Sequence, residues 1–259
     1  MTDNDLAWRA EEACMNAWPS PRQAVFGGWL LRAAGGAIRR ANSVNPLRGC
    51  NGDAQAVIPV AEALYGALGQ TPLFRIPSLV GSPPLERMEG TLESAGYTAE
   101  GHTLTLFAEL TRGAAAAGGD VELLPQASGA WLDARARMSG IDAAERQIYE
   151  AMLDSILLPR VFAAARDDGQ IASVAYAVVL DGLAVIESVI TDPALRQRGL
   201  ARRSVGTLLD WARACGARGA CLQVVADNPP ALKLYRSLGF DRELYRYHYR
   251  RKDAAKAPR

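Results

Sequence analysis

Residues 191–203 read Thr-Asp-Pro-Ala-Leu-Arg-Gln-Arg-Gly-Leu-Ala-Arg-Arg and lie between an apolar stretch and an amphipathic one. The apolar stretch favours a strand, and the following stretch repeats apolar residues at helical spacing, at Val205, Leu208, Leu209 and Ala212. A glycine-containing turn at a helix start leaves backbone N–H groups unpaired, and the helix dipole adds partial positive charge there. This order of elements predicts an anion site suited to phosphates.

The residue types inside this turn agree with a phosphate ligand. Gly199 allows a phosphate to approach the backbone closely. Four arginines add positive charge with no acidic residue among them: Arg196, Arg198, Arg202 and Arg203. A solvated basic start of a helix is the alternative. Neither GxxxxGK[ST] nor GxGxxG fits, because the Lys-Ser/Thr pair is missing and the turn has a single glycine.

A longer pattern around this turn resembles a known family. Arg196, Gly199 and Ala201 form Arg-x-x-Gly-x-Ala, which resembles the acetyl-CoA pyrophosphate loop of the GNAT N-acetyltransferase superfamily. Within residues 222–240, Asn-Pro-Pro-Ala and Leu-Tyr-Arg-Ser-Leu-Gly-Phe resemble the Asn-x-x-Ala and Leu-Tyr-x-x-x-Gly-Phe signatures of that superfamily, in the same order and spacing. The resemblance covers roughly residues 165–250, a third of the chain.

The resemblance implies acetyl-CoA as cosubstrate, with its pyrophosphate on the backbone of the turn and its pantetheine arm along the preceding strand. It implies that Tyr235 protonates the departing thiolate, which suits a phenol with a pKa of about 10. A packed aromatic position beside Leu232 and Leu238 is the alternative for Tyr235. The expected cosubstrate-binding residues are Val189, Ile190, Arg196, Gln197, Arg198, Gly199, Leu200, Ala201, Arg202, Asn228 and Tyr235.

Glu187 is the candidate for the general base. An amine nucleophile must lose a proton before it attacks, and a carboxylate inside an apolar strand beside the expected cleft can accept it directly or through water. A solvent-facing residue on an alternating strand is the alternative for Glu187. Glu243, His102 and His248 are outside candidates, and a structural strand position is the alternative for His248.

The two halves of the chain share an order of elements. In each half a helix ends at a glycine, a strand follows, and a second helix ends at another glycine before a further strand. This repetition predicts an α/β (α+β) protein of two GNAT-like mixed-sheet units packed side by side. Residues 1–118 are the expected degenerate N-terminal unit, because their loop at 45–52 lacks the Arg-x-x-Gly-x-Ala spacing. Residues 119–259 are the expected catalytic unit, after a small-residue linker at 112–119.

Periodicity and turn residues predict the individual elements. The first expected element is a hairpin with strands at 28–32 and 37–44. The other expected helices are 54–68, 84–95, 131–138, 143–157, 201–215 and 230–238, and the other strands are 73–76, 103–110, 121–124, 160–165, 171–180, 183–191, 219–226 and 240–250.

The composition is that of an ordinary soluble globular protein, with 49% hydrophobic and 22% charged residues. A formal charge of +1 excludes a surface that is a nucleic-acid footprint throughout. The first residues lack the basic and apolar regions of a signal peptide, and no apolar stretch approaches the ~20 residues of a membrane span. Four cysteines without CxxC spacing indicate free thiols in the cytoplasm and no zinc site.

The resemblance and these limits together predict a cytoplasmic N-acetyltransferase. It is expected to move acetyl from acetyl-CoA to a primary amine by direct attack in a ternary complex. The expected acceptor is a small molecule or a peptide, with no nucleic acid, membrane or metal as partner, and the expected state is a monomer or a homodimer. The alternative function is a non-catalytic acyl-CoA-binding regulatory module.

Overall fold

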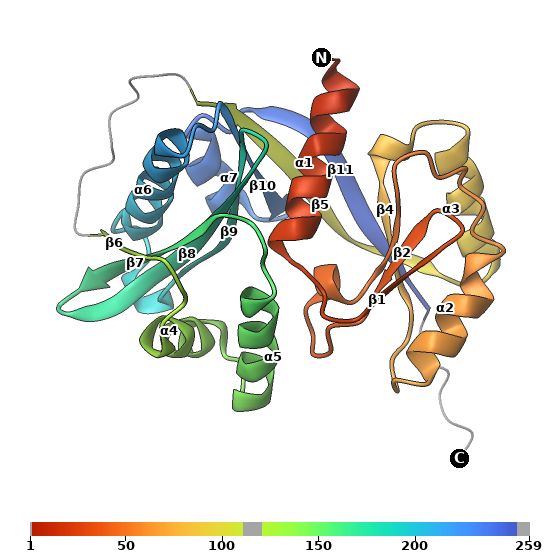
Figure 1. Cartoon of the computed structure of the whole chain (residues 1–259), viewed down its shortest axis with the longest axis horizontal. Helices are drawn as coiled ribbons and strands as arrows, with labels where there is room; N and C mark the ends of the chain where they lie inside the picture. The colour runs from red at the N-terminus through yellow and green to blue at the C-terminus, as the bar shows by residue number, and fades with distance from the viewer. Residues whose placement is uncertain (1, 111–120, 253–259) are drawn as a thin grey trace. The chain divides into compact units, whose positions relative to one another are not determined.

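A computed structural model describes residues 2–110 and 121–252 of the chain (Figure 1). The expected linker at 112–119 and the expected boundary after residue 118 lie outside the described residues. Two compact units are present, and each combines separate stretches of the chain. Unit 1 contains residues 2–19, 105–110, 121–224 and 228–244, and unit 2 contains residues 20–104, 225–227 and 245–252.

Unit 1 is built on a mixed sheet with the strand order β5-β10-β9-β8-β7-β6. These strands are β5 (Thr98–Glu109, from Thr105 on), β6 (Val121–Leu124), β7 (Arg160–Asp167), β8 (Gln170–Leu180), β9 (Leu183–Thr191) and β10 (Gly219–Val225). From β6 to β9 neighbouring strands are antiparallel, whereas β10 runs parallel to β9. Parallel neighbours need a crossover connection, and the helix after the arginine-rich turn supplies it.

The helices of unit 1 cover this sheet on both faces. They are α1 (Asp3–Ala17), α4 (Gly129–Ser139), α5 (Ala143–Asp154), α6 (Leu200–Ala214) and α7 (Pro229–Arg236). Helix α6 packs on β7, β8 and β9, and α4 packs on β8 and β9, on opposite sides of the strands in Figure 1. Helix α6 buries the four apolar residues that the sequence pattern places on one face, at Val205, Leu208, Leu209 and Ala212.

Helix α1 is an element that the sequence patterns do not predict. It begins at a capping box, in which Thr2 Oγ1 accepts from Asp5 N and Asp5 Oδ2 accepts from Thr2 N. Half of its eight buried residues are alanines and one is Glu11, so its apolar periodicity is weak. Tyr176 Oη donates to the carbonyl of Ala17 at 2.7 Å, which anchors the end of α1 to β8.

Among the described residues, unit 2 contains the strand order β1-β2-β3-β4-β11-β5, with β5 up to Leu104, and two α-helices. Besides β5, the elements are β1 (Gln23–Phe26), β2 (Trp29–Arg32), β3 (Val44–Pro46), α2 (Val57–Gly66), β4 (Leu73–Pro77), α3 (Pro84–Ser94) and β11 (Arg242–Arg251, from Tyr245 on). Its core gathers aromatic rings, with Phe74 edge-on to both Trp29 and Tyr97. This apolar core explains why the helices and β4 follow the sequence pattern closely.

The expected strand at 37–44 is wrong. Residues Arg39–Ala41 form a short 3-10 helix, and β3 starts only at Val44, although it does pair antiparallel with β2. The side-chain amide of Asn42 donates to the carbonyls of Gly35 and Ile38, and its oxygen accepts from Gly35 N. These bonds fold the segment on itself in place of a sheet ladder.

The expected mixed α/β fold class is confirmed. Strands β6 and β9 have the expected bounds, and the other helices and strands of unit 1 after β6 differ from expectation mainly at their ends. No helix in the described part of the chain is long and apolar enough to cross a membrane.

Candidate functional site

The arginine-rich turn enters α6 through a glycine in a left-handed conformation. Gly199 is the N-cap of α6 with φ 76°, and no side chain caps the helix there. The first turn of α6 carries no acidic residue. A Cβ built on Gly199 would meet no atom within 4 Å, so the space beside the turn is open. An uncapped helix start beside open space meets the requirements of an anion site.

Two of the arginines have partners that orient them. Arg198 Nη1 lies 3.2 Å from Asp167 Oδ2, at the end of β7, so an acidic residue does approach the turn from outside it. Arg202 Nη1 donates to Ser237 Oγ at 2.6 Å, and Ser237 is the residue that ends α7. Arg202 thereby connects the turn to the helix that carries Tyr235.

The entry to the turn is held by Asp192. Its Oδ1 accepts from Ala194 N at 3.0 Å, and Arg137 Nη1 of α4 donates to its Oδ2 at 2.5 Å. Arg137 Nη2 also donates to the carbonyl of Ile171 in β8. The hydrogen bonds from Arg137 and Ala194 lower the pKa of Asp192, which therefore remains ionised at neutral pH.

Strand β9 carries a bulge just before its end. Val174 of β8 is opposite Ile190, and Tyr176 is opposite Glu187, so β9 has one residue more than β8 in this interval. Ser188 occupies the bulge with φ 51°, in the left-handed region. The bulge reorients the last residues of β9.

Strands β9 and β10 also separate at this end. Among the described residues their parallel pairing covers 183–186 against 219–222, although β9 continues to Thr191. Val189 and Ile190 lie beyond the last pair and are half-buried. An extended ligand can pair with such a strand edge as if it were an added strand.

Glu187 lies in the interior of unit 1. It is 3% exposed, so the solvent-facing alternative is wrong. It lies near the thiol of Cys14, whose pKa is raised by contact with the Cys221 thiol 3.9 Å away, by burial, and by the charges of Glu187 and Glu11. Glu187 directly precedes the bulge at Ser188 and is two positions from Val189, where the expected pantetheine edge begins.

Asn228 and Tyr235 lie on α7. Asn228 is exposed and is the N-cap of the helix, where its Oδ1 accepts from Ala231 N at 3.2 Å, and its amide nitrogen remains a donor. Tyr235 is 8% exposed and packs edge-on against Phe240 at 6.2 Å between ring centroids. This packing fits the structural alternative for Tyr235 and fixes the position of its ring.

Two of the outside candidates for the base lie close to each other. His102 and His248 lie in unit 2, with their ring centroids 5.4 Å apart. His248 Nε2 lies 3.0 Å from Glu89 Oε1, and burial lowers the pKa of His248 although Glu89 opposes that shift. Glu243 lies on β11 and is exposed.

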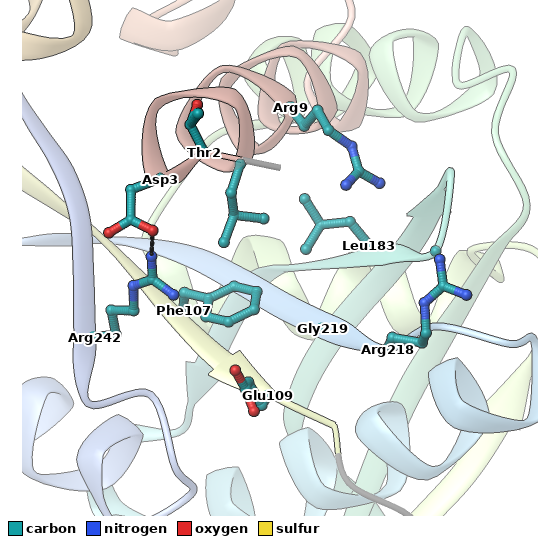
Figure 2. A pocket seen from close by; sticks show the side chains of 11 residues that line it. Thr2, Asp3, Arg9, Phe107, Glu109, Leu183, Arg218, Gly219 and Arg242 are labelled. Atoms are coloured by element: carbon teal, nitrogen blue, oxygen red, sulfur yellow. Dashed lines mark ion pairs between the residues drawn. The ribbon is translucent and has the colours of Figure 1, made fainter.

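Figure 2 shows a separate pocket at the opposite ends of β9 and β10, with a volume of about 270 Å³. Leu183 and Gly219, where these strands start, line it, and none of the expected site residues does. Its rim is largely neutralised by ion pairs, because Arg242 lies 2.7 Å from Asp3 and Arg9 contacts a carboxylate outside the pocket. This pocket is therefore distinct from the expected site.

Within residues 2–110 and 121–252, no three His, Cys, Asp or Glu side chains come together as metal ligands.

Comparison with known proteins extends the likeness over nearly the whole chain. The family described as "Probable histone acetyltransferase Rv0428c C-terminal" matches residues 8–250. The relative named "Uncharacterized N-acetyltransferase YobR", from Bacillus subtilis (strain 168), is 26% identical over 248 residues, which are 93% of this chain and 97% of the relative. The chain belongs to this family of GNAT acetyltransferases.

Solved GNAT structures share the fold along the full length. A GCN5-related N-acetyltransferase from Kribbella flavida superposes with a TM-score of 0.66 at 18% identity, over 97% of each chain. A tandem GNAT protein from the clavulanic acid biosynthesis pathway superposes with a TM-score of 0.65 at 14% identity, over 100% of this chain and 98% of that one. The expected superfamily is confirmed, and the protein is an acetyltransferase that performs acyl transfer.

Several residues that shape the site of this GNAT protein are not predicted from the sequence. The Asp192-Pro193 pair is a recognisable cap signal before the turn, but its Arg137 partner lies 55 positions away. Ser188 and its neighbour Tyr149 give no local signal, because a bulge depends on the pairing of two strands.

Proposed function

We propose that the protein binds acetyl-CoA along β9 and the 196–202 turn and transfers the acetyl group to a primary amine by direct attack in a ternary complex. The observation that carries this proposal is the uncapped start of α6 at Gly199, with open space beside it. An anionic diphosphate suits that position, since it would accept from backbone N–H groups that no side chain caps.

Backbone and side-chain groups of the turn would both bind the diphosphate. The backbone of Gln197, Gly199, Leu200 and Ala201 supplies N–H donors, and Gly199 leaves room for a close approach. Arg196, Arg198 and Arg202 add positive charge around it. The arginines are expected to strengthen binding more at low salt than at high salt.

The end of β9 supplies the second part of the binding site. The backbone of Val189 and Ile190 lies beyond the last β9–β10 pair and would pair with the pantetheine amides. The amide nitrogen of Asn228 would donate to the same arm. Together with the turn, these groups align the thioester beside the bulge of β9.

Two side chains would move protons during transfer. The amine nitrogen attacks the thioester carbonyl carbon, the C–S bond breaks, and the thiolate takes a proton from Tyr235 Oη. Glu187 would accept the proton that the amine loses, through a water because the carboxylate is nearly buried. The next cycle begins when the phenolate of Tyr235 and the carboxyl of Glu187 return to their starting protonation states.

The cysteines support direct attack over a cysteine-bound acyl intermediate. Cys14 and Cys221 are buried, and the raised pKa of Cys14 keeps its thiol protonated. Cys50 is buried in unit 2. Cys215 is exposed, but it ends α6, a helix length of roughly 20 Å from Gly199.

The acceptor is proposed to be a small-molecule or peptide amine, and the reaction is proposed to occur in the cytoplasm, where free thiols persist. Unit 2 is proposed to be a GNAT-like unit without a working acetyl-CoA site. A non-catalytic acyl-CoA-binding role is less well supported, because the family is one of acetyltransferases and Tyr235 is present.

Tyr235→Phe tests the catalytic part of the proposal. After an amine panel has identified an acceptor by thiol release, the variant is expected to lower kcat by about 100-fold, because it removes the acid alone. Its acetyl-CoA affinity, measured by calorimetry, should match that of the natural protein. Unchanged turnover would remove Tyr235 from the mechanism, and absence of turnover with every amine despite tight acetyl-CoA binding would favour the non-catalytic role.

A further inference from the structure

The bulge residue of β9 is held in a conformation that serine rarely adopts. Ser188 has φ 51°, where a side chain other than that of glycine is strained. An ordinary strand residue at this position would restore regular pairing with β8. The left-handed conformation belongs to the bulge, and a contact of the Ser188 side chain outside β9 would stabilise it.

Among the described residues, the Ser188 hydroxyl has one contact, with Tyr149 of α5. Tyr149 Oη and Ser188 Oγ lie 2.6 Å apart, so they share a short hydrogen bond. Tyr149 is 1% exposed, and burial raises its pKa, so its hydroxyl keeps its proton at neutral pH. The two hydroxyls satisfy each other in a place where unpaired polar groups are costly.

The ring of Tyr149 is itself fixed by its neighbours. The guanidinium carbon of Arg135 lies 3.4 Å from the ring centroid, and the ring of Trp131 stacks at 6.5 Å with an interplanar angle of 7°. Both residues come from α4. The hydroxyl of Tyr149 is thus a rigid anchor point for β9, carried by the pair of helices α4 and α5.

Loss of this anchor would change the two residues that follow. If Ser188 returned to an extended conformation, the bulge would disappear and the pairing of β9 would shift by one residue. The side chains of Val189 and Ile190 would then turn to the opposite faces of the sheet, and their backbone N–H and C=O groups would point to the opposite edges of the strand. Their backbone groups would no longer point to the side on which the pantetheine arm is proposed to lie.

We propose that Tyr149 is a positioning residue that holds Ser188 in the left-handed conformation and so presents the backbone of Val189 and Ile190 to the pantetheine arm. The inference rests on the proposed function. It assigns to α5 a role in cosubstrate binding without direct contact with the cosubstrate.

Tyr149→Phe tests this role, because it removes the hydroxyl and keeps the packed ring. Calorimetry is performed with two probes: CoA, and 3′-phospho-ADP, the nucleotide half of CoA without the pantetheine arm. The affinity for CoA is expected to fall on the order of 3- to 10-fold, and that for 3′-phospho-ADP is expected to stay unchanged. Equal loss for both probes, or no loss for either, would overturn the inference.

Ser188 variants distinguish the proposed role of Tyr149 from a general loss of packing in unit 1. Ser188→Ala, which loses the bond but keeps the strain, should repeat the effect of Tyr149→Phe, and Ser188→Gly should retain CoA affinity because glycine accepts the positive φ. Tyr149→Phe should then have no further effect in the Ser188→Gly background. A full effect in that background would contradict the inference.

A natural protein that binds 3′-phospho-ADP but not CoA would overturn the pantetheine assignment, and one that binds neither would overturn the proposed function with it.

Discussion

The turn at 196–202 in unit 1 and the loop at 45–52 in unit 2 both precede a helix and both contain glycines with positive φ, but the space beside them differs. A Cβ on Gly199 would meet nothing within 4 Å. A Cβ on Gly52 would lie 2.1 Å from the carbonyl oxygen of Pro84, at the start of α3. The space beside Gly52 is therefore filled, whereas the space beside Gly199, and that beside Gly49 earlier in the second loop, is open.

The residues that lead into the two helices also differ. In unit 2 the carboxylate of Asp53 accepts from Gln55 N at 3.0 Å, and Asn51 Oδ1 accepts from Asp53 N at 2.9 Å. Neither α2 nor α6 has a side-chain cap or an acidic residue in its first turn. The difference lies before the caps, where the chain supplies Asp53 ahead of α2 and two arginines, Arg196 and Arg198, ahead of α6. A similar order of elements can therefore support an anion site or exclude one, depending on which groups the chain supplies.

The largest expected effect comes from Gly199→Glu. The new side chain adds strain at φ 76° and puts a carboxylate where a phosphate is proposed to bind, so acetyl-CoA affinity should fall by about 100-fold or more. Gly49→Glu is the matched control, because Gly49 also has positive φ and open space beside it. Calorimetry should show nearly unchanged affinity for that variant. Equal losses in the two variants would contradict the assigned difference between the loops.

Gly52→Ala probes the filled loop through stability. The added Cβ would overlap the backbone of Pro84, so the free energy of unfolding should fall by about 2–4 kcal/mol. Gly49→Ala shares the positive φ without the overlap and should cost only about 1 kcal/mol. Urea denaturation measures both values. A Gly52→Ala variant as stable as Gly49→Ala would show that the second loop is not closely packed.

Arg202→Ala is expected to have the smallest effect. It removes one charge beside the turn and the hydrogen bond to Ser237, so acetyl-CoA should bind about 3- to 10-fold more weakly at low salt. The difference should narrow as the salt concentration rises. Arg48→Ala, in the loop of unit 2, is the control and should not change affinity at either salt concentration. A salt-independent loss in Arg202→Ala would point to a structural role alone.

Much of unit 1 follows from local sequence. The glycine turn, the apolar face of α6 and the bounds of β9 depend on near neighbours in the chain, and each is found where the pattern predicts it. Asn228 and Tyr235 share α7 for the same reason. These features need only helical or strand periodicity and a turn residue.

The features that escape prediction depend on distant partners. Half of the buried residues of helix α1 are alanines, and packing on β8 and β9 stabilises the helix. Glu187 follows a run of four apolar residues at 183–186, and it is buried on β9, the strand on which α1 packs. The bulge at Ser188 requires β8 on one side and Tyr149 on the other. No residue spacing within a single segment encodes such contacts.

The most direct test of the account is the stoichiometry of acetyl-CoA binding to the full chain, measured by calorimetry. The difference between the open turn and the filled loop predicts one site per chain, and Gly199→Glu should abolish it while the folded state persists. Two sites per chain would contradict the interpretation of the loop at 45–52, and a single site that survives Gly199→Glu would contradict the assignment of the turn at 196–202.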